Sequence, residues 1–313
     1  MICPKYSKVK KQYENVFSNI IGLLQSHPES FDNQDSMVKL WVHECYRVFH
    51  DRLVDEKDRT WFRNLVSDKL AGLFGQSWAK LYKNSLVPSL FGDFMTDEAN
   101  YQELQSNENY DSIRNHMMGV LEEFNVEAGH VPMDLVLFKD AIEHVCRIHR
   151  IIHQPRGNAL LVGVNGSGRA SLTRLAAVMA EYKMFTVEIK KGFRDVDFRD
   201  KLKDLYYMTG IEEKPTVFLF SDNQIINESF LEDISNILSR GEIPNLYTVE
   251  ELATIRDAMR QQEMEKNGPK DSKVTNDQLI ERFIERAWNN IHVVLCMSPG
   301  TVYAYNAVSY IFL

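Results

Sequence analysis

The sequence predicts an α/β fold, in which a three-layer αβα domain with a parallel sheet follows an all-helical region. In the C-terminal half, short apolar runs of strand length alternate with helical patterns, which is typical of a parallel sheet covered by helices. In the N-terminal part, apolar residues recur at steps of three and four, which indicates amphipathic helices. The expected strands are residues 158–164, 184–189, 216–220 and 291–297.

Helical patterns and breaks divide the chain into predicted domains. We expect a helical region at residues 1–92, a connecting segment at 93–130, and the α/β domain at 131–313. Residues 248–290 are polar and helix-prone with a Gly-Pro break, so a helical hairpin is expected between the last two strands. The other expected helices are residues 16–24, 37–53, 59–73, 110–125, 139–152, 167–179, 193–208 and 230–238.

The composition limits the functions that the chain can have. It has 313 residues and a net charge of −8, and this negative charge disfavours a broad nucleic-acid surface. The four cysteines are scattered without the spacing of a metal site, which indicates reduced thiols. The sequence has no apolar run of membrane-spanning length and no signal-peptide core. We therefore expect an intracellular, cytoplasmic protein that binds neither membrane nor nucleic acid.

The stretch GNALLVGVNGSGRASLTRL, at residues 157–175, contains the most informative motif. It reads as strand, glycine-rich turn and helix, the context in which backbone N–H groups and a helix N-terminus bind phosphate. The turn residues expected to lie against the ligand are Gly163, Asn165, Gly166, Ser167 and Gly168. The motif therefore predicts a phosphate loop, and the alternative is a glycine-rich turn that holds no ligand.

The loop departs from the usual phosphate-loop motif at two positions. Arg169 stands where Lys is usual, so a planar guanidinium replaces a compact ammonium group. Ala170 stands where Ser or Thr is usual and has no hydroxyl to offer a magnesium ion. Ser171 follows one residue later, about 100° further round the helix, so it does not simply replace that hydroxyl. We therefore expect phosphate binding with slow or absent hydrolysis.

Two strand ends supply further candidate groups, because ligands bind at the carboxyl ends of parallel strands. The run TVFLF is followed by Ser221 and Asp222, where a phosphate-loop enzyme needs two carboxylates. Asp222 either holds magnesium, with Asn223 in the place of the water-orienting Glu, or stands in for that Glu, with Ser221 replacing the magnesium Asp. Ser298 follows the run IHVVLCM and is expected to face the terminal phosphate.

Several motifs together resemble the motor region of dynein heavy chains, especially axonemal ones. Those similar to the large subdomain of the fourth AAA+ module are PMDLVLFKDAIEHVCRIHRIIHQPRGNALLVGVNGSGRASLTRLAA, KPTVFLFSDNQIINESFLEDISNILSRGEIPNLY and IHVVLCMSP. Upstream, MVKLWVHECYRVFHDRLVDEKDRTWF is similar to the helical lid of the third module. The resemblance covers residues 37–299, and the tail at residues 300–313 does not continue it.

The resemblance implies an AAA+ P-loop domain that binds ATP or ADP with Mg²⁺. Asp222 would take the second of the two positions above and act in catalysis with Ser298, a polar sensor. Leu135 and Val136 would flank the adenine, and Arg47 would be a second sensor of the preceding module. The residues implied for the nucleotide loop are Gly163, Asn165, Gly166, Ser167, Gly168, Arg169, Ala170 and Ser171. The candidate magnesium residues are Ser171, Ser221 and Asp222.

The resemblance also implies partners and a location. The fourth module is regarded as regulatory in this family, its partners would be the neighbouring AAA+ modules of a dynein ring, and its location the cytoskeleton of a ciliary or flagellar axoneme. Intermediate chains, light chains and microtubules would be reached only through a full-length chain. We expect a fragment that lacks a fifth core strand, which would leave the loop strand at an exposed edge; coverage of that edge by the β-prone residues 302–313 is the alternative. The alternative is a nucleotide-free structural or partner-binding remnant without ATPase activity.

Overall fold

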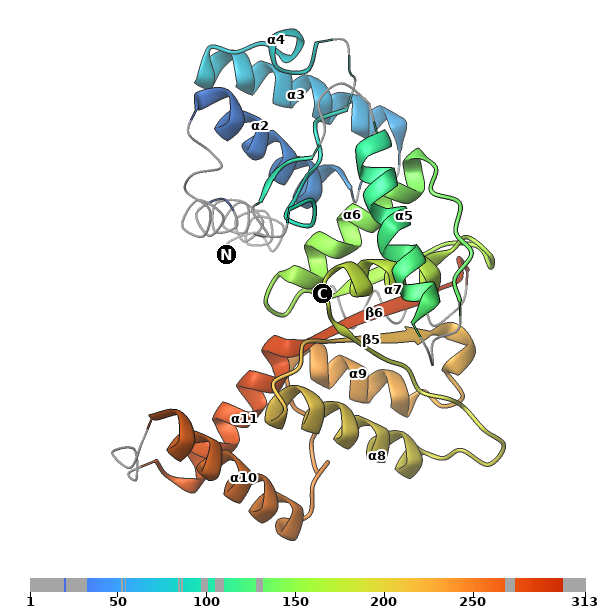
Figure 1. Ribbon diagram of the computed structural model, residues 1–313, viewed down its shortest axis with the longest axis vertical. Coiled ribbons are helices and arrows are strands. Elements are labelled where there is room, and N and C mark those ends of the chain that lie inside the picture. The colour runs from blue at the N-terminus through green and yellow to red at the C-terminus, as the bar shows by residue number, and fades with distance from the viewer. Residues whose placement is uncertain are drawn as a thin grey trace, which may run out of the picture. The chain divides into compact units, whose positions relative to one another are not determined.

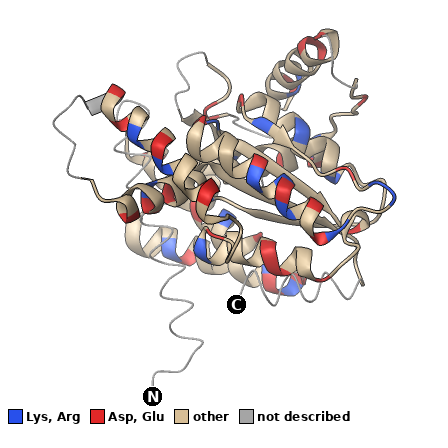
Figure 2. Cartoon of the chain, turned by 90° about the horizontal axis from the view of Figure 1, so that it is seen from below, with Lys and Arg blue, Asp and Glu red and all other residues tan. Residues whose placement is uncertain are grey.

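The structure of the chain is a computed structural model that forms two compact units, Met1–Arg147 and Ile148–Leu313 (Figure 1). It describes Ile20 and residues 33–51, 53, 55–83, 85, 87–96, 101–104, 110–127, 132–267 and 274–300. In the view of Figure 2, Lys and Arg are interspersed with Asp and Glu along the helices. Within the described ranges, no helix combines the length and the apolarity needed to cross a bilayer.

The first unit is mainly helical, and its helices at 37–53 and 59–73 are confirmed, with small shifts at their ends. Helix α3 ends at Gly75, whose left-handed backbone (φ 63°) stops the helix without steric cost. The predicted stripe at 16–24 lies outside the described residues, apart from Ile20. The elements are α2 (Gln34–Cys45), η2 (Tyr46–His50), α3 (Glu56–Phe74), α4 (Trp78–Tyr82), β1 (Phe91–Gly92), β2 (Gln102–Glu103), α5 (Asp111–Val126) and α6 (Lys139–His153), which crosses the boundary between the units.

The second unit is the predicted α/β domain. Its strands pair in parallel in the order β3-β6-β5-β4. The strands are β3 (Ala159–Val162), β4 (Lys183–Phe185), β5 (Thr216–Ser221) and β6 (Ile291–Met297). The helices are α7 (Arg169–Met179), α8 (Asp195–Tyr206), η3 (Tyr207–Ile211), η4 (Asp222–Gln224), α9 (Ser229–Arg240), α10 (Val249–Asn267) and α11 (Asn276–Asn290). The α/β class and the parallel sheet are therefore confirmed.

Helices cover both faces of this sheet. Figure 1 shows α7 on one side of β5 and β6, and α8 and α9 on the other. On the second side, Phe218 and Phe220 of β5 join a core with Phe198 of α8 and Phe230 of α9, whose rings stack with centroids 4.1 Å apart. Each fully buried Phe stabilises the fold by about 1.5–3 kcal/mol. This packing fixes the carboxyl ends of the central strands on a rigid base.

Two strands are shorter than predicted. Strand β3 covers Ala159–Val162 rather than 158–164, because the chain turns into the glycine loop at Gly163. Strand β4 covers Lys183–Phe185 rather than 184–189. Beyond it, the carbonyl of Val187 accepts a hydrogen bond from Nε2 of Gln224, so its partner is a side chain and not the backbone of a neighbouring strand.

Strand β3 lies at one end of the described sheet, next to β6. Residues 302–313, the alternative cover for its other edge, lie outside the described residues.

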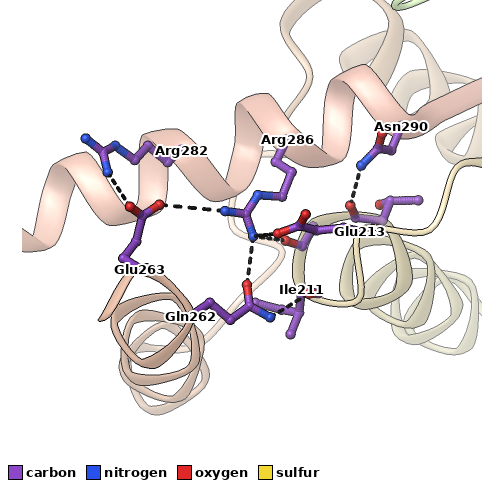
Figure 3. Close-up of polar contacts among 9 residues, drawn as sticks. Ile211, Glu213, Gln262, Glu263, Arg282, Arg286 and Asn290 are labelled. Carbon is purple, nitrogen blue, oxygen red and sulfur yellow. Dashed lines mark hydrogen bonds and ion pairs between the residues drawn. The ribbon is translucent and has the colours of Figure 1, made fainter. Parts of the chain in front are cut away.

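The predicted helical hairpin is confirmed as α10 and α11, and a polar cluster fixes it to the end of η3 (Figure 3). The guanidinium of Arg286 lies 2.7 Å from Oε1 of Glu213 and donates a hydrogen bond of 2.7 Å to Oε1 of Gln262. Glu263 pairs with Arg282 at 2.8 Å. Since α11 leads directly into β6, this cluster also helps to place the strand that Ser298 follows.

Candidate functional site

The glycine loop joins β3 to α7 and is tied to the neighbouring strand. The N–H of Gly163 donates a hydrogen bond of 3.1 Å to the carbonyl of Met297, at the end of β6. A Cβ added at Gly163 would lie 2.9 Å from Oγ of Ser167, so a side chain there would require the Ser167 side chain to move. Gly166 and Gly168 adopt left-handed φ values of 82° and 79°, which favour glycine. Backbone conformation therefore favours glycine at positions 166 and 168, and the contact with Ser167 favours it at position 163.

Helix α7 starts directly from the loop. Its N-cap is Gly168, which has no side chain to cap the first turn, and the N–H of Leu172 donates to the carbonyl of Gly168 at 2.8 Å. The hydroxyl of Thr173 donates back to the carbonyl of Arg169 at 2.8 Å. The first N–H groups of a helix point out of its N-terminus and attract anions. The loop therefore presents backbone donors, as the motif predicts.

The ends of β5 and β6 bring the two candidate catalytic residues together. Ser221 of β5 is in register with Cys296 of β6, so the residues that follow meet at the same edge of the sheet. The backbone N–H of Ser298 donates to Oδ2 of Asp222 at 2.8 Å. Burial raises the pKa of the Asp222 carboxyl, but hydrogen bonds from Ser298 and the charge of Arg169 outweigh it and hold that pKa below its ordinary value. Asp222 is therefore a carboxylate at neutral pH.

A second contact joins these strand ends to the loop. Oδ1 of Asn165 accepts a hydrogen bond from the Ser298 hydroxyl at 3.2 Å and another from Nη2 of Arg169 at 3.2 Å. The polar chain thus runs from Arg169 through Asn165 and Ser298 to Asp222. Three segments that are far apart in the sequence therefore converge beside the glycine loop.

The guanidinium of Arg169 fits an anionic ligand. Its Nη1 is buried and has no hydrogen-bond partner among the described residues. A buried donor without a partner is destabilising, and a phosphate oxygen would satisfy it. The loop conformation and this free donor both fit a polyphosphate.

The donor set for magnesium is sparser. Asp222 supplies a carboxylate, Ala170 supplies no oxygen, and Ser171 lies on the first turn of α7. Ser221 precedes η4, and its N–H donates to Oε1 of Gln224 at 2.7 Å. Gln224 was not predicted, although the spacing of Ser221 and Gln224 matches a capping box and could have indicated its role.

Three predicted residues lie in the other unit. Leu135 is half-buried and Val136 is 80% exposed, both just before α6. Arg47 lies in η2, and its Nε is 3.3 Å from Oδ2 of Asp51. Their roles toward a nucleotide stay predictions, because each unit is defined by itself.

The glycine loop between a parallel strand and a helix, facing polar strand ends, defines a P-loop α/β domain of the AAA+ type. The sequence profile described as P-loop containing dynein motor region D4 matches residues 133–307, and an AAA+ lid domain profile matches residues 5–81. The chain therefore belongs to the dynein heavy-chain family. The first match extends to residue 307, so the family pattern continues beyond Pro299, where we expected it to stop.

Similar full-length proteins are axonemal and flagellar dynein heavy chains. The chain is 45% identical over 278 residues to dynein axonemal heavy chain 2 of Homo sapiens, which covers 89% of this chain. It is 43% identical over 282 residues, 90% of the chain, to the dynein-1-beta heavy chain, flagellar inner arm I1 complex, of Chlamydomonas reinhardtii. It is 43% identical over 284 residues, 89% of the chain, to dynein axonemal heavy chain 1 of Rattus norvegicus. The chain spans about 6% of the length of each of these relatives.

Proposed function

We propose that this segment is a degenerate, regulatory nucleotide module of a dynein heavy chain, which binds ATP or ADP and hydrolyses ATP slowly or not at all. The observation that carries the proposal is the convergence of Arg169, Asn165, Ser298 and Asp222 beside the glycine loop. Membership of the P-loop dynein family supports nucleotide as the ligand.

The proposed roles follow from the chemistry of each group. Backbone N–H groups from Asn165 to Ser171 bind phosphate oxygens, and Arg169 neutralises their charge through its free Nη1. Ser298 donates to the terminal phosphate. Asp222 accepts a proton or a hydrogen bond at the strand end. Leu135 and Val136 flank the adenine.

Magnesium binding is proposed to be weak. Mg²⁺ prefers oxygen ligands in near-octahedral geometry and usually retains several waters. The proposed protein ligands are the Asp222 carboxylate and the hydroxyls of Ser221 and Ser171. Because Ala170 lacks a hydroxyl, the metal is less firmly placed than in an efficient phosphate-loop enzyme. When bound, the ion would neutralise phosphate charge.

The wider role depends on a longer chain. We propose that, within a full-length dynein heavy chain, this module contacts neighbouring AAA+ modules and contributes to ATP-dependent movement along microtubules in an axoneme. The names of the similar proteins support the axonemal setting. We also propose that the helical region ends at residue 92 and that the α/β domain begins after residue 130.

The test is a titration of the 313-residue chain with fluorescent ATP and ADP, with and without Mg²⁺. Gly168→Val puts a β-branched side chain at φ 79°, and we expect it to weaken binding by at least about tenfold. Gly192→Val is the matched control, because Gly192 has a similar φ of 86° in a loop between β4 and α8. Equal binding by the wild-type chain and Gly168→Val would contradict the site. A wild-type chain that binds no nucleotide would instead favour the structural remnant.

A further inference from the structure

Asn165 has a geometry that the phosphate-loop motif does not require. Its Oδ1 is the common acceptor for Nη2 of Arg169 and for the hydroxyl of Ser298, both at 3.2 Å. One donor comes from the first turn of α7, and the other follows β6. The carboxamide thus links the start of α7 to the end of β6. It lies beside the hydrogen bond from the N–H of Gly163 to the carbonyl of Met297.

We propose that Asn165 is a positioning residue that occupies Arg169 and Ser298 in the empty site and yields both donors to the terminal phosphate of a nucleoside triphosphate. This inference rests on the proposed nucleotide function. It also gives a reason for the site to distinguish a triphosphate from a diphosphate: both donors bind the terminal phosphate, which a diphosphate lacks.

The exchange of partners is favoured by charge. A carboxamide oxygen is neutral, whereas a phosphate oxygen carries negative charge. The Ser298 bond therefore changes from a neutral one to a charge-assisted one, which is about twice as strong, and the Arg169 bond gains an opposite charge on its acceptor. Arg169 gains the most hydrogen bonding from the exchange. Its Nη2 donates to Asn165, and its buried Nη1 has no hydrogen-bond partner among the described residues. A phosphate can accept from both.

Asn165 is placed so that it can yield. Its side chain is exposed, and it lies in the turn between Gly163 and Gly166, away from any packed core. Rotation of its side chain therefore costs little beyond the two hydrogen bonds. Ser298 retains its backbone bond to Asp222 during the exchange, so the strand ends stay together.

The test compares the affinities of fluorescent ATP and ADP for the wild-type chain, Asn165→Ala and Asn165→Asp. Removing the carboxamide frees both donors, so Asn165→Ala should bind ATP about three- to tenfold more tightly, with a smaller gain for ADP. Asn165→Asp keeps the acceptor and adds a charge that pairs with Arg169 and repels phosphate, so it should bind ATP more weakly than the wild-type chain. Asn227→Ala is the control, because it removes a carboxamide that bonds Asp195, outside the loop.

The outcomes separate this inference from the proposed function. If the wild-type chain binds nucleotide and Asn165→Ala binds ATP equally or more weakly, the positioning role is wrong while the nucleotide site stands. If no variant binds nucleotide, both are wrong. NMR of the arginine side chains gives an independent readout: the Arg169 guanidinium signal should change in Asn165→Ala without any nucleotide and stay unchanged in Asn227→Ala. An unchanged signal in Asn165→Ala would also overturn the inference.

Discussion

The backbone N–H of Ser298 lies 2.8 Å from Oδ2 of Asp222, and this hydrogen bond joins the ends of two adjacent parallel strands. It orients the carboxylate before any ligand is present. It also places the hydroxyl of Ser298 toward Asn165 in the glycine loop. The two strand ends are therefore joined beside the glycine loop without a ligand, as the proposed nucleotide site requires.

The Asp222 carboxylate should stabilise the fold in a pH-dependent way. Its folded pKa is lowered, so its contribution is present above the unfolded value of about 4 and is lost as pH falls through the folded pKa. We expect Asp222→Ala to lose about 1–2 kcal/mol of unfolding free energy at pH 7. Urea denaturation from pH 7 to pH 2 should show this deficit shrinking below about pH 4. Asn223→Ala, next to it, is the control, and a deficit independent of pH would refute the argument.

His292 should make the domain sensitive to acid. Burial lowers its pKa to about 4, more than the hydrogen bond to the Gly157 carbonyl raises it, and the charge of His153 lowers it further. Because the unfolded imidazole takes up a proton near pH 6.5 and the folded one does not, stability falls as pH drops from 6.5 to 4.

The expected loss across this pH range is at most about 3 kcal/mol. His292→Gln should abolish that part of the pH dependence, measured by urea denaturation at several pH values, whereas His116→Gln in the other unit should not. An NMR titration that gives His292 a pKa near 6.5 would show this explanation to be mistaken.

Arg286 should hold the helical hairpin in place. Its side chain is 19% exposed and contacts both Glu213 and Gln262, as Figure 3 shows. We expect Arg286→Ala to cost about 1–3 kcal/mol, because two partly buried partners lose their charged donor. Arg282→Ala is the matched control: Arg282 is 45% exposed and should cost no more than about 1 kcal/mol. If chemical denaturation gave the two variants the same loss of unfolding free energy, the contacts of Arg286 would contribute no more than an exposed surface ion pair.

Ala170 should limit the response to magnesium. Ala170→Thr adds a hydroxyl at the position where phosphate loops usually hold the metal, so Mg²⁺ should raise ATP affinity more in this variant than in the wild-type chain. Titrations with Mg²⁺ and with EDTA give the comparison, and Ala253→Thr in α10 controls for the substitution itself. No gain in the magnesium effect would mean that some other feature limits metal binding.

Much of the fold is predictable because its signals are local. Apolar runs such as TVFLF indicated the central strands, and the glycine motif indicated the turn between β3 and α7. The early end of β4 was not predictable, because it depends on Gln224, which lies far along the chain and bonds Val187.

In the candidate site too, some features were predictable from the sequence and others were not. Asp222 and Ser298 were expected at one edge because parallel strands end together, and they lie there. The acceptor role of Asn165 toward Arg169 and Ser298 depends on side-chain geometry across three segments, which residue spacing does not reveal. The hydroxyls of Ser221 and Ser298 and the carboxylate of Asp222 could be identified from the sequence, but their hydrogen bonds could not be predicted from it.

The most direct test of the nucleotide site is hydrogen exchange of the 313-residue chain with and without saturating ATP and Mg²⁺. If the loop amides bind phosphate, peptides covering residues 157–175 should exchange more slowly with nucleotide, while α10 should be unaffected. Unchanged exchange in residues 157–175 at a nucleotide concentration that saturates binding would contradict the account.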